Sequence, residues 1–411
     1  MSAKTADQRV VITGLGSVNA IGKDVSSFRR SLVEGISGVR PLSRLPSDDF
    51  PVKIAAEISH PAVDKDNFVE HDFLSRSSAL AWLSAKEALE DAQLADFLPR
   101  QLKLGLVGSI GWRPHRESEL KGEERMQPVL LHEGVEWLAE KLALNGLVRG
   151  CLSACAASTQ SIGQACQYLL RGYADAMLAG GADSRIHRLG LTGYARLGVL
   201  TEAWNDAPHL ASRPFDRQRN GFVTGEGGAF LVLETLQHAQ ARSAKIYAEV
   251  ASWSATSDAF RVTDPQPDGE GAARCMHLCL ERSNVSLSDV DVINAHGTST
   301  WANDSMEARA LAKVFGERLR DIPVVAMKSQ MGHLSMAAGA AETVGAVLMM
   351  QEDQVPGTLN FHQGDADLVY SLNISNKTRQ VKAVKQVLKN SFGFGGQNAC
   401  LLLKKLDEAR R

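Results

Sequence analysis

Short apolar runs that end in glycine alternate along this chain with longer runs of helical spacing, and the pattern occurs twice. The strand-like runs span residues 10–16, 103–109, 174–182 and 227–234 in the first set, and 245–258, 289–299, 323–329 and 398–405 in the second. The helical runs span 73–94, 158–173, 271–284, 305–316 and 336–351. Strands that alternate with helices predict α/β layers built around buried mixed sheets.

This repetition divides the chain into two similar halves that meet near residues 240–250. A chain of 411 residues is longer than one hydrophobic core usually spans, so two packed units are expected. The halves are not separated by a low-complexity linker, which predicts a tight interface. We therefore expect an N-terminal half at 1–245 and a C-terminal half at 246–411. The polar stretch 113–136 is expected to be a partly helical surface excursion.

Charge and composition argue against several classes of protein. The formal net charge of -2 provides no general attraction to nucleic acid or to an anionic membrane. The apolar runs are too short, or too interrupted by glycine and glutamate, to span a bilayer. The first residues do not resemble a secretory signal, and six cysteines in a chain of this size do not form a disulfide framework. We expect a protein of the reducing cytoplasm.

The segment CLSACAAS (151–158) joins a strand-like stretch to a helix through a run of small residues. Cys155 therefore lies near a helix N-terminus, where free N–H groups and the helix dipole favour a thiolate. The small neighbours leave room for a substrate to approach, so Cys155 is a candidate nucleophile. The alternative is a buried structural cysteine, because free cysteine is often a core residue.

Metal and nucleotide sites find little support in the motifs. Cys151 with Cys155, and Cys275 with Cys279, have the spacing C-x₃-C rather than the C-x₂-C hairpin that is typical of zinc. The segment GLGSVNAIG has Asn19 where a dinucleotide loop would have its third glycine. We expect neither a metal nor a resident cofactor, and we expect the cysteines other than Cys155 to be packing residues.

A histidine stands at the end of another predicted strand, in NAHGTST (294–300). His296 is followed by glycine, so its side chain is well placed to point into a cleft, where Thr298 and Thr300 could donate hydrogen bonds. A structural histidine whose ring is satisfied within a turn is the alternative reading.

The segment KSQMGHLSMAAGAAE (328–342) repeats this arrangement at a third strand end. Lys328 and His333 lie across a strand-to-helix turn, and Glu342 follows within the helix, where it could form an ion pair with Lys328. Each residue alone would be unremarkable. One strand end carries a cysteine, the second a histidine, and the third a lysine and a histidine. This combination favours a catalytic cleft.

The segment KNSFGFGGQNA (389–399) surrounds Phe392 and Phe394 with small residues. Such a loop can adopt positive φ angles and can move. An ordinary glycine-rich turn between two strands is the alternative.

Taken in order, the motifs SACAAS, NAHGTST, KSQMGHLSMAAGA and NSFGFGGQNA resemble those of the β-ketoacyl-[acyl-carrier-protein] synthases I and II, which are thiolase-like condensing enzymes. The segment SRPFDRQRNGFVTGEGGAFLVLE (212–234) adds to a similarity that covers nearly the whole chain. The resemblance implies a thiolase-like fold with two similar αβαβα layered halves, each around a mixed five-stranded sheet. It also implies a homodimer.

The resemblance further implies roles for the motif residues. Cys155 would accept an acyl chain from the phosphopantetheine thioester of an acyl carrier protein. His296 and His333 would assist decarboxylation of a malonyl thioester, and Lys328, supported by Glu342, would orient the histidines. The enzyme would thus extend a fatty-acid or polyketide-like chain by two carbons without a cofactor of its own.

Backbone N–H groups of Cys155 and Phe394 would form an oxyanion hole, and Phe394 would gate the acyl pocket. The other implied site residues are Thr298 and Thr300 for the pantetheine arm, Gly393 and Gly395 at the gate, and Ile110, Tyr194 and Phe392 in the acyl pocket.

Some positions depart from the family pattern. Trp301 replaces a common proline, Arg261 replaces a common histidine, and Tyr194 replaces a common phenylalanine. The helix near residue 73 offers only Arg76 where a basic cluster for gripping an acidic carrier is expected. These departures indicate a specialised paralogue.

Two other readings compete with a condensing enzyme. A degradative thiolase would use a second cysteine as its base, whereas this chain has His333. A non-catalytic, chain-length-determining partner subunit of a heterodimer would have lost the nucleophile, whereas Cys155 is present.

Overall fold

The computed structural model describes residues 9–46, 50–60, 63, 73–94, 102–111, 130–366 and 372–406. Most of the expected surface excursion at 113–136 lies outside these residues, and its last part enters helix α4 (Glu133–Lys141). Among the described helices, none combines the length and the apolar character needed to cross a membrane.

Within the described residues, the centre of the molecule is a ten-stranded mixed sheet of order β10-β9-β13-β14-β8-β1-β7-β6-β4-β5. Its N-terminal strands are β1 (Val10–Asn19), β4 (Leu104–Ile110), β5 (Val148–Gly150), β6 (Ala176–Ser184) and β7 (Glu226–Thr235). Its C-terminal strands are β8 (Ala248–Ser257), β9 (Val292–Asn294), β10 (Val324–Val325), β13 (Gln386–Gly393) and β14 (Gln397–Lys404). Two short ribbons lie apart from it, β2 (Arg40–Pro41) with β3 (Ile54–Ala55) and β11 (Gln354–Val355) with β12 (Arg379–Gln380).

The two halves of this sheet have the same topology. In the N-terminal half, β7 is antiparallel to both β1 and β6, and β6, β4 and β5 run parallel. In the C-terminal half, β14 is antiparallel to both β8 and β13, and β13, β9 and β10 run parallel. The halves join where β1 pairs with β8 over Val10 to Ile12. From this repeat we propose that the chain divides between β7 and β8, near the expected residue 245.

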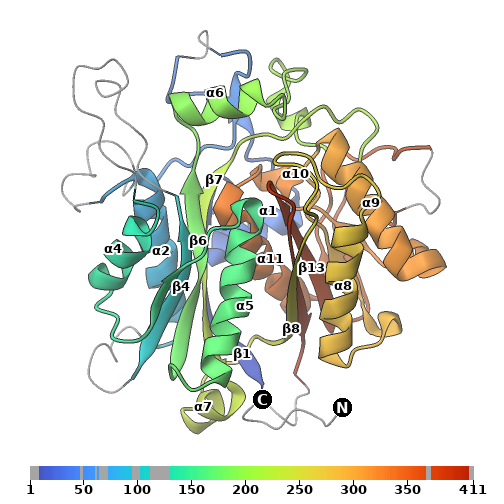
Figure 1. The fold of residues 1–411 in the computed structure, drawn as a ribbon. Helices are drawn as coiled ribbons and strands as arrows, with labels where there is room; N and C mark the ends of the chain where they lie inside the picture. Colours follow the sequence, from blue (N-terminus) through green and yellow to red (C-terminus); the bar gives the residue numbers. More distant parts are fainter. Residues whose placement is uncertain are drawn as a thin grey trace.

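Helices form three layers around the two half-sheets (Figure 1). In Figure 1, α2 and α4 flank the N-terminal strands on the left, and α8 and α9 flank the C-terminal strands on the right. Helices α5 and α11 lie between the half-sheets and contact strands of both. Their bounds are α2 (Arg76–Asp91), α5 (Ala157–Leu170), α8 (Glu270–Ser283), α9 (Trp301–Phe315) and α11 (Ala338–Glu352). The remaining α-helices are α1 (Val25–Glu34), α6 (Arg188–Arg196), α7 (Leu236–Ala241) and α10 (Lys328–Met331). The expected thiolase-like α/β fold of two similar layered halves is confirmed.

Helix α11 shows why the middle layer holds the halves together. From Ala338 to Met350 every residue is buried, and small residues dominate its first turns. A helix that is apolar on all sides is stable only where packing surrounds it completely. It shares one core with α5 and with residues of β1, β7, β8, β13 and β14.

The glycines of the GLG segment serve packing. Gly14 and Gly16 lie inside strand β1, and a Cβ at Gly16 would lie 1.9 Å from the carbonyl oxygen of Ser84 on α2. Glycine is therefore required for the close approach of this helix to the sheet.

Strand β13 differs from the expectation of a mobile loop at 389–399. Residues Asn390 to Gly393 lie inside β13, and β14 begins at Gln397, so only 394–396 form the turn of a hairpin. The strand is buried on both faces from Val387 to Phe392. A strand buried on both faces lacks the polar–apolar alternation by which a strand is recognised in sequence.

Candidate active site

Cys155 lies at a strained junction between strand β5 and helix α5. A single 3₁₀ turn, Ala154–Ala156, precedes the helix, and Ala154 has φ 48°, which is unusual for a residue other than glycine. Strained backbone of this kind is common where a reactive side chain must be presented. Small residues make the turn possible, because Ala156, Ala157 and Ser158 are all buried.

The expectation that the helix start favours a thiolate at Cys155 is wrong for the free protein. Burial raises the pKa of the Cys155 thiol to about 11, and the positive charge of Lys328 and the backbone N–H of Phe394 lower it only in part. Desolvation is therefore the largest influence on the thiol and outweighs these two opposing contacts. The resting side chain is a protonated thiol.

His296 and His333 lie together beside Cys155. Their ring centroids are 5.5 Å apart with the planes nearly perpendicular, and both residues are buried. Both rings and Cys155 line one cavity of about 260 Å³. Burial and the charge of Lys328 hold the pKa of each histidine well below its usual value. Both imidazoles are therefore neutral near pH 7.

The hydrogen bonds of the two rings define their tautomers. Lys328 Nζ lies 3.1 Å from His296 Nδ1, and the backbone N–H of Ser335 donates to His333 Nδ1 at 3.1 Å. An ammonium and an amide N–H can only donate, so both Nδ1 atoms accept. The proton of each neutral ring is thus on Nε2.

Lys328 is anchored from two sides. Its ammonium donates to the carbonyl oxygen of His296 at 2.6 Å and forms a close ion pair with Glu342 Oε1, as the sequence led us to expect. Both side chains are fully buried. A buried charge needs such pairing, because leaving it alone would cost several kcal/mol.

Phe394 and Cys155 both line this cavity and a second one of about 470 Å³. The side chain of Phe394 therefore stands where the two cavities meet. Gly395 has φ 79°, which permits the tight turn after Phe394. A Cβ at Gly393 would lie 3.0 Å from the backbone nitrogen of Cys155, so glycine lets the hairpin approach Cys155.

The structure separates the three residues expected in the acyl pocket. Tyr194 lines the second cavity, and its hydroxyl lies 3.1 Å from the Ser335 hydroxyl. Phe392 lines the first cavity instead, 5.9 Å from the His296 ring. Ile110 lies in neither cavity, because the end of β4 turns its side chain into the core beneath α2 and α4.

Thr298 and Thr300 line the first cavity, as expected, with their hydroxyl oxygens 2.9 Å apart. The exposed side chain of Trp301 lies beside them on the same cavity. Beneath Trp301, the guanidinium of Arg219 lies 4.1 Å from the indole centroid. Such a cation–π contact restricts the indole.

Two buried carboxylates hold the segment that follows His296, and the sequence reading missed both. Glu307 accepts the N–H groups of His296 and Gly297 at 2.8 Å each, and Asp304 accepts those of Thr298 and Ser299 at 2.8 and 3.0 Å. Acidic residues three apart on the buried face of α9, directly after the histidine, were the signal available in the sequence.

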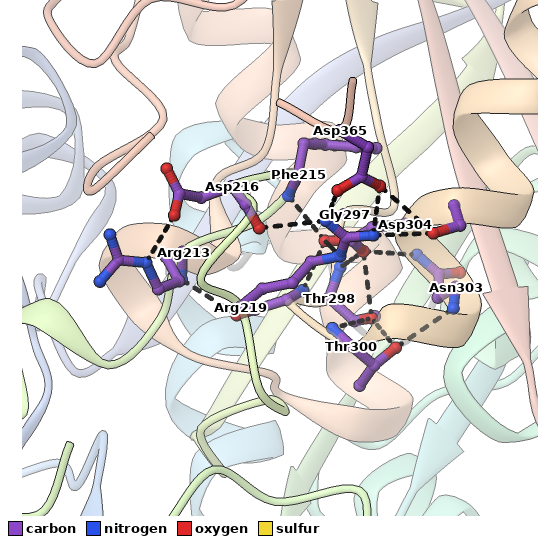
Figure 2. Close-up of polar contacts among 12 residues, drawn as sticks. Arg213, Phe215, Asp216, Arg219, Gly297, Thr298, Thr300, Asn303, Asp304 and Asp365 are labelled. Carbon is purple, nitrogen blue, oxygen red and sulfur yellow. Dashed lines mark hydrogen bonds and ion pairs between the residues drawn. The ribbon is translucent and has the colours of Figure 1, made fainter. Parts of the chain in front are cut away.

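A wider ionic network supports Asp304 (Figure 2). Asp304 also accepts the backbone N–H of Phe215 at 2.7 Å, and Arg219 pairs with Asp365 through contacts of 2.8 and 2.6 Å. Figure 2 shows Arg219 reaching from the 213–219 segment toward Asp304 and Asp365. The segment 213–219 therefore supports the backbone that follows His296.

Asp183 and Arg185 are further residues that the sequence reading missed. Both line the second cavity, and Arg185 Nε donates to Asp183 Oδ2 at 3.0 Å. The cysteines other than Cys155 are buried in the core, and Cys275 and Cys279 contact the Ser254 and Ser252 hydroxyls. Within the described residues, no three His, Cys, Asp or Glu side chains gather in a way that could hold a metal ion.

Comparison with known proteins gives a consistent family. The profile of the β-ketoacyl synthase N-terminal domain matches residues 7–239, and that of the C-terminal domain matches residues 247–362. A 3-oxoacyl-[acyl-carrier-protein] synthase 2 of Coxiella burnetii is 37% identical over 97% of this chain and 99% of its own length.

Solved structures agree with these matches. A β-ketoacyl synthase from Burkholderia phymatum has a TM-score of 0.86 at 31% identity, over 97% of this chain and 100% of that one. A type II polyketide ketosynthase, solved in complex with its acyl-carrier protein and bound to the hexaketide, has a TM-score of 0.83 at 27% identity. That match covers 97% of this chain and 99% of the other.

Proposed function

Because this chain belongs to the β-ketoacyl synthase family, we propose that it is an acyltransferase that joins an acyl group on Cys155 to a malonyl unit by decarboxylative condensation. One observation carries the assignment of roles. Both histidine Nδ1 atoms accept hydrogen bonds, so two neutral imidazoles offer Nε2–H donors around the cavity that Cys155 lines.

In the first step the sulfur of Cys155 attacks the carbonyl carbon of the acyl thioester. The carbonyl oxygen gains negative charge, and the backbone N–H groups of Cys155 and Phe394 stabilise it. When the tetrahedral intermediate collapses, the carrier thiolate leaves and takes the proton that the Cys155 thiol gave up. Each of these oxyanion donors is worth about 10²–10³ in rate.

In the second step the two Nε2–H groups donate hydrogen bonds to the thioester oxygen of the malonyl group. The carbon–carbon bond to the carboxylate breaks, carbon dioxide leaves, and its electron pair forms an enolate. The enolate carbon then attacks the acyl group on Cys155, and the thiolate leaves and regains a proton. His296 and His333 suit this role because they are neutral and fixed as donors.

Lys328 and Glu342 position these donors. The Lys328 ammonium holds His296 Nδ1 as an acceptor and, through its charge, disfavours a second positive charge on either ring. Glu342 holds Lys328 in place. This supports a positioning role for the pair, away from the reacting atoms.

The first cavity fits the pantetheine arm of a carrier protein, and we propose Thr298 and Thr300 as its hydrogen-bond partners. The second cavity, lined by Tyr194, would take the acyl chain, with Phe394 as the gate between the two. The reactive groups are all supplied by side chains and by the carrier, so we propose that the enzyme needs no resident cofactor.

We propose an acyl carrier protein as the partner, since a similar ketosynthase was solved in complex with one. Arg76 is not available to grip it, because its guanidinium is committed to Glu226 through two contacts of 2.8 Å. The carrier would therefore dock elsewhere, around the mouth of the first cavity beside the exposed Trp301.

We also propose that the protein is a homodimer of the cytoplasm. Among the described strands, β5 ends the sheet, and Leu152 after it is 49% exposed, which suits pairing with a second copy. All six cysteines lie in the described part of the chain and none forms a disulfide, which is common in a reducing compartment. The alternative of a non-catalytic subunit in a heterodimer is disfavoured, because Cys155 is present and shares its cavity with both histidines.

Intact-protein mass spectrometry tests the assignment. After incubation with acyl carriers of different chain lengths, the protein should gain the mass of the acyl group, and Cys155→Ala should gain nothing. Cys151→Ala is a matched control, which should still be acylated on Cys155. Cys151 itself is buried, and its thiol is hydrogen-bonded to the Ser153 hydroxyl. Acylation of the Cys155→Ala variant would overturn the proposal.

A further inference from the structure

A second lysine, Lys389, is buried near the two histidines, and it has no role in the proposed acyl-transfer and condensation steps. Lys389 stands in the middle of strand β13 and is 0% exposed. Burying an ammonium is costly unless charged and polar groups surround it, so its partners show what its charge is for.

Glu342 is the charged partner of Lys389. The ammonium nitrogen of Lys389 lies 3.1 Å from Glu342 Oε2, while Lys328 pairs with Oε1 of the same carboxylate. One buried carboxylate is therefore shared by two buried ammonium groups. The pair Lys328–Glu342 alone would be neutral, and Lys389 adds one positive charge.

Hydroxyl groups complete the site of Lys389. Its ammonium donates to Thr159 Oγ1 at 2.9 Å and to the Ser391 hydroxyl, and these two oxygens lie 2.8 Å apart. Thr159 belongs to α5, four residues after Cys155, and Glu342 belongs to α11, nine residues after His333. Lys389 thus links β13 to both helices that follow the reactive residues.

The titratable groups around the Lys389 ammonium lie on several neighbouring elements. They are Glu342 on α11, Lys328 on α10, the Cys400 thiol on β14, and the rings of His296 and His333. Glu307 on α9 faces the backbone of His296 from the other side. Of these, Lys328 and Lys389 are the cations that act on both histidines.

We propose that Lys389 is a positioning residue for the decarboxylation step, which acts through the shared carboxylate of Glu342 and keeps a net positive charge beneath the two histidines. The inference rests on the proposed function of those histidines. The charge disfavours protonation of both rings, so each Nδ1 stays an acceptor for Lys328 or the Ser335 N–H and the Nε2–H groups stay oriented. It also favours the negative charge of the enolate.

The pKa values agree with this geometry. Burial lowers the pKa of Lys389 to about 8, with a further lowering by Lys328, while Glu342 opposes the shift. Lys389 therefore keeps its charge at neutral pH. For both His296 and His333, the charge of Lys389 is one of the causes of a lowered pKa.

The test replaces Lys389 by methionine, which keeps most of its length and removes its charge. Malonyl-carrier decarboxylation by Lys389→Met should fall roughly 10-fold at pH 7. The acid limb of its pH–rate profile should shift to higher pH by about half a unit or more, because the histidines become easier to protonate. Acylation of Cys155, measured on the same preparations, should change less than about threefold.

Two comparisons separate this role from packing. Ser391→Ala removes a hydrogen-bond partner of Lys389 but leaves the charge, so its acid limb should coincide with that of the unmodified protein. Glu342→Gln combined with Lys389→Met leaves Lys328 as the cation of this cluster, so the net charge equals that of the unmodified protein. Its acid limb should therefore lie nearer to that of the unmodified protein than the acid limb of Lys389→Met does. Should Lys389→Met fail to fold, Lys389→Gln provides a neutral residue that can still donate to Thr159.

The outcomes are distinct. An unmoved acid limb in the neutral variants, with only a lower melting temperature, would overturn the proposal and leave Lys389 as a packing residue. Failure of the proposed function would instead appear in the unmodified protein, as absence of malonyl decarboxylation and of Cys155 acylation.

Discussion

Ser335 fixes the protonation pattern of His333 through its own backbone. Its φ of 50° lies in the left-handed region, and its N–H donates to His333 Nδ1 at 3.1 Å. The same turn geometry recurs at Ala154, with φ 48°, one residue before Cys155. In both halves of the molecule a strained residue opens a 3₁₀ turn and a central helix, and each turn orients one member of the site.

Replacement of His333 should separate the two chemical steps. His333→Ala removes one Nε2–H donor to the enolate, so malonyl decarboxylation should fall by about 10²–10³. Acyl transfer to Cys155 uses backbone donors and should persist. Release of carbon dioxide and mass spectrometry of the acyl-enzyme measure the two steps independently, and an equal loss in both would contradict the division of roles.

The reactivity of Cys155 should follow a high thiol pKa. Because the pKa is raised to about 11, alkylation of the free protein by iodoacetamide should rise about tenfold per pH unit from pH 7 to 9. Peptide mass spectrometry follows Cys155 specifically. Lys328→Met should slow the reaction at each pH, because loss of the positive charge raises the thiol pKa further. A plateau near neutral pH would show a preformed thiolate.

A side chain at Gly393 should displace the nucleophile. In Gly393→Ala the new Cβ would lie 3.0 Å from Cys155 N and from Ser153 O, so the oxyanion donors must shift. Acylation of Cys155 should fall at least about tenfold, since small misplacements of donors are costly. Gly108→Ala is the matched control in a buried strand, where the nearest atoms lie at an ordinary 3.5 Å. Equal effects of both changes would exclude a specific role for position 393.

Acid stability should depend on Glu234, far from the site. Hydrogen bonds from Arg242, His238 and Thr13 outweigh burial and lower the pKa of Glu234 to about 2. The unfolded chain has the ordinary pKa of about 4.5, so this stabilisation is full above that pH and is lost as the pH falls toward 2. Glu234→Gln should therefore cost about 2 kcal/mol at pH 6 and clearly less at pH 3.

Thermal unfolding at the two pH values measures this difference. Glu352→Gln serves as the control, because Glu352 pairs with Arg29 on the surface, where both side chains are over a third exposed. Its effect should be small at either pH. A Glu234→Gln effect that stays constant between pH 6 and pH 3 would contradict the lowered pKa.

The sequence alone predicted the layered α/β fold and the gathering of Cys155, His296, Lys328 and His333, which the structure places together. The reason is local: strand-to-helix turns rich in small residues leave a recognisable pattern around Cys155, His296, Lys328 and His333. Their catalytic roles stay a prediction. The hairpin at 389–399 was missed as a strand, because β13 is buried on both faces and shows no alternation. Ile110 was placed in the acyl pocket, yet the end of β4 directs it into the core.

Only the tertiary structure decided the electrostatics of the site. The sequence favoured a thiolate at Cys155, whereas burial among the two half-sheets leaves a protonated thiol. Lys389 is 47 positions from Glu342, and only the packing of β13 against α11 brings their charges to 3.1 Å. Motifs record which side chains are present, but desolvation and the sharing of a buried carboxylate depend on distances that no local pattern contains.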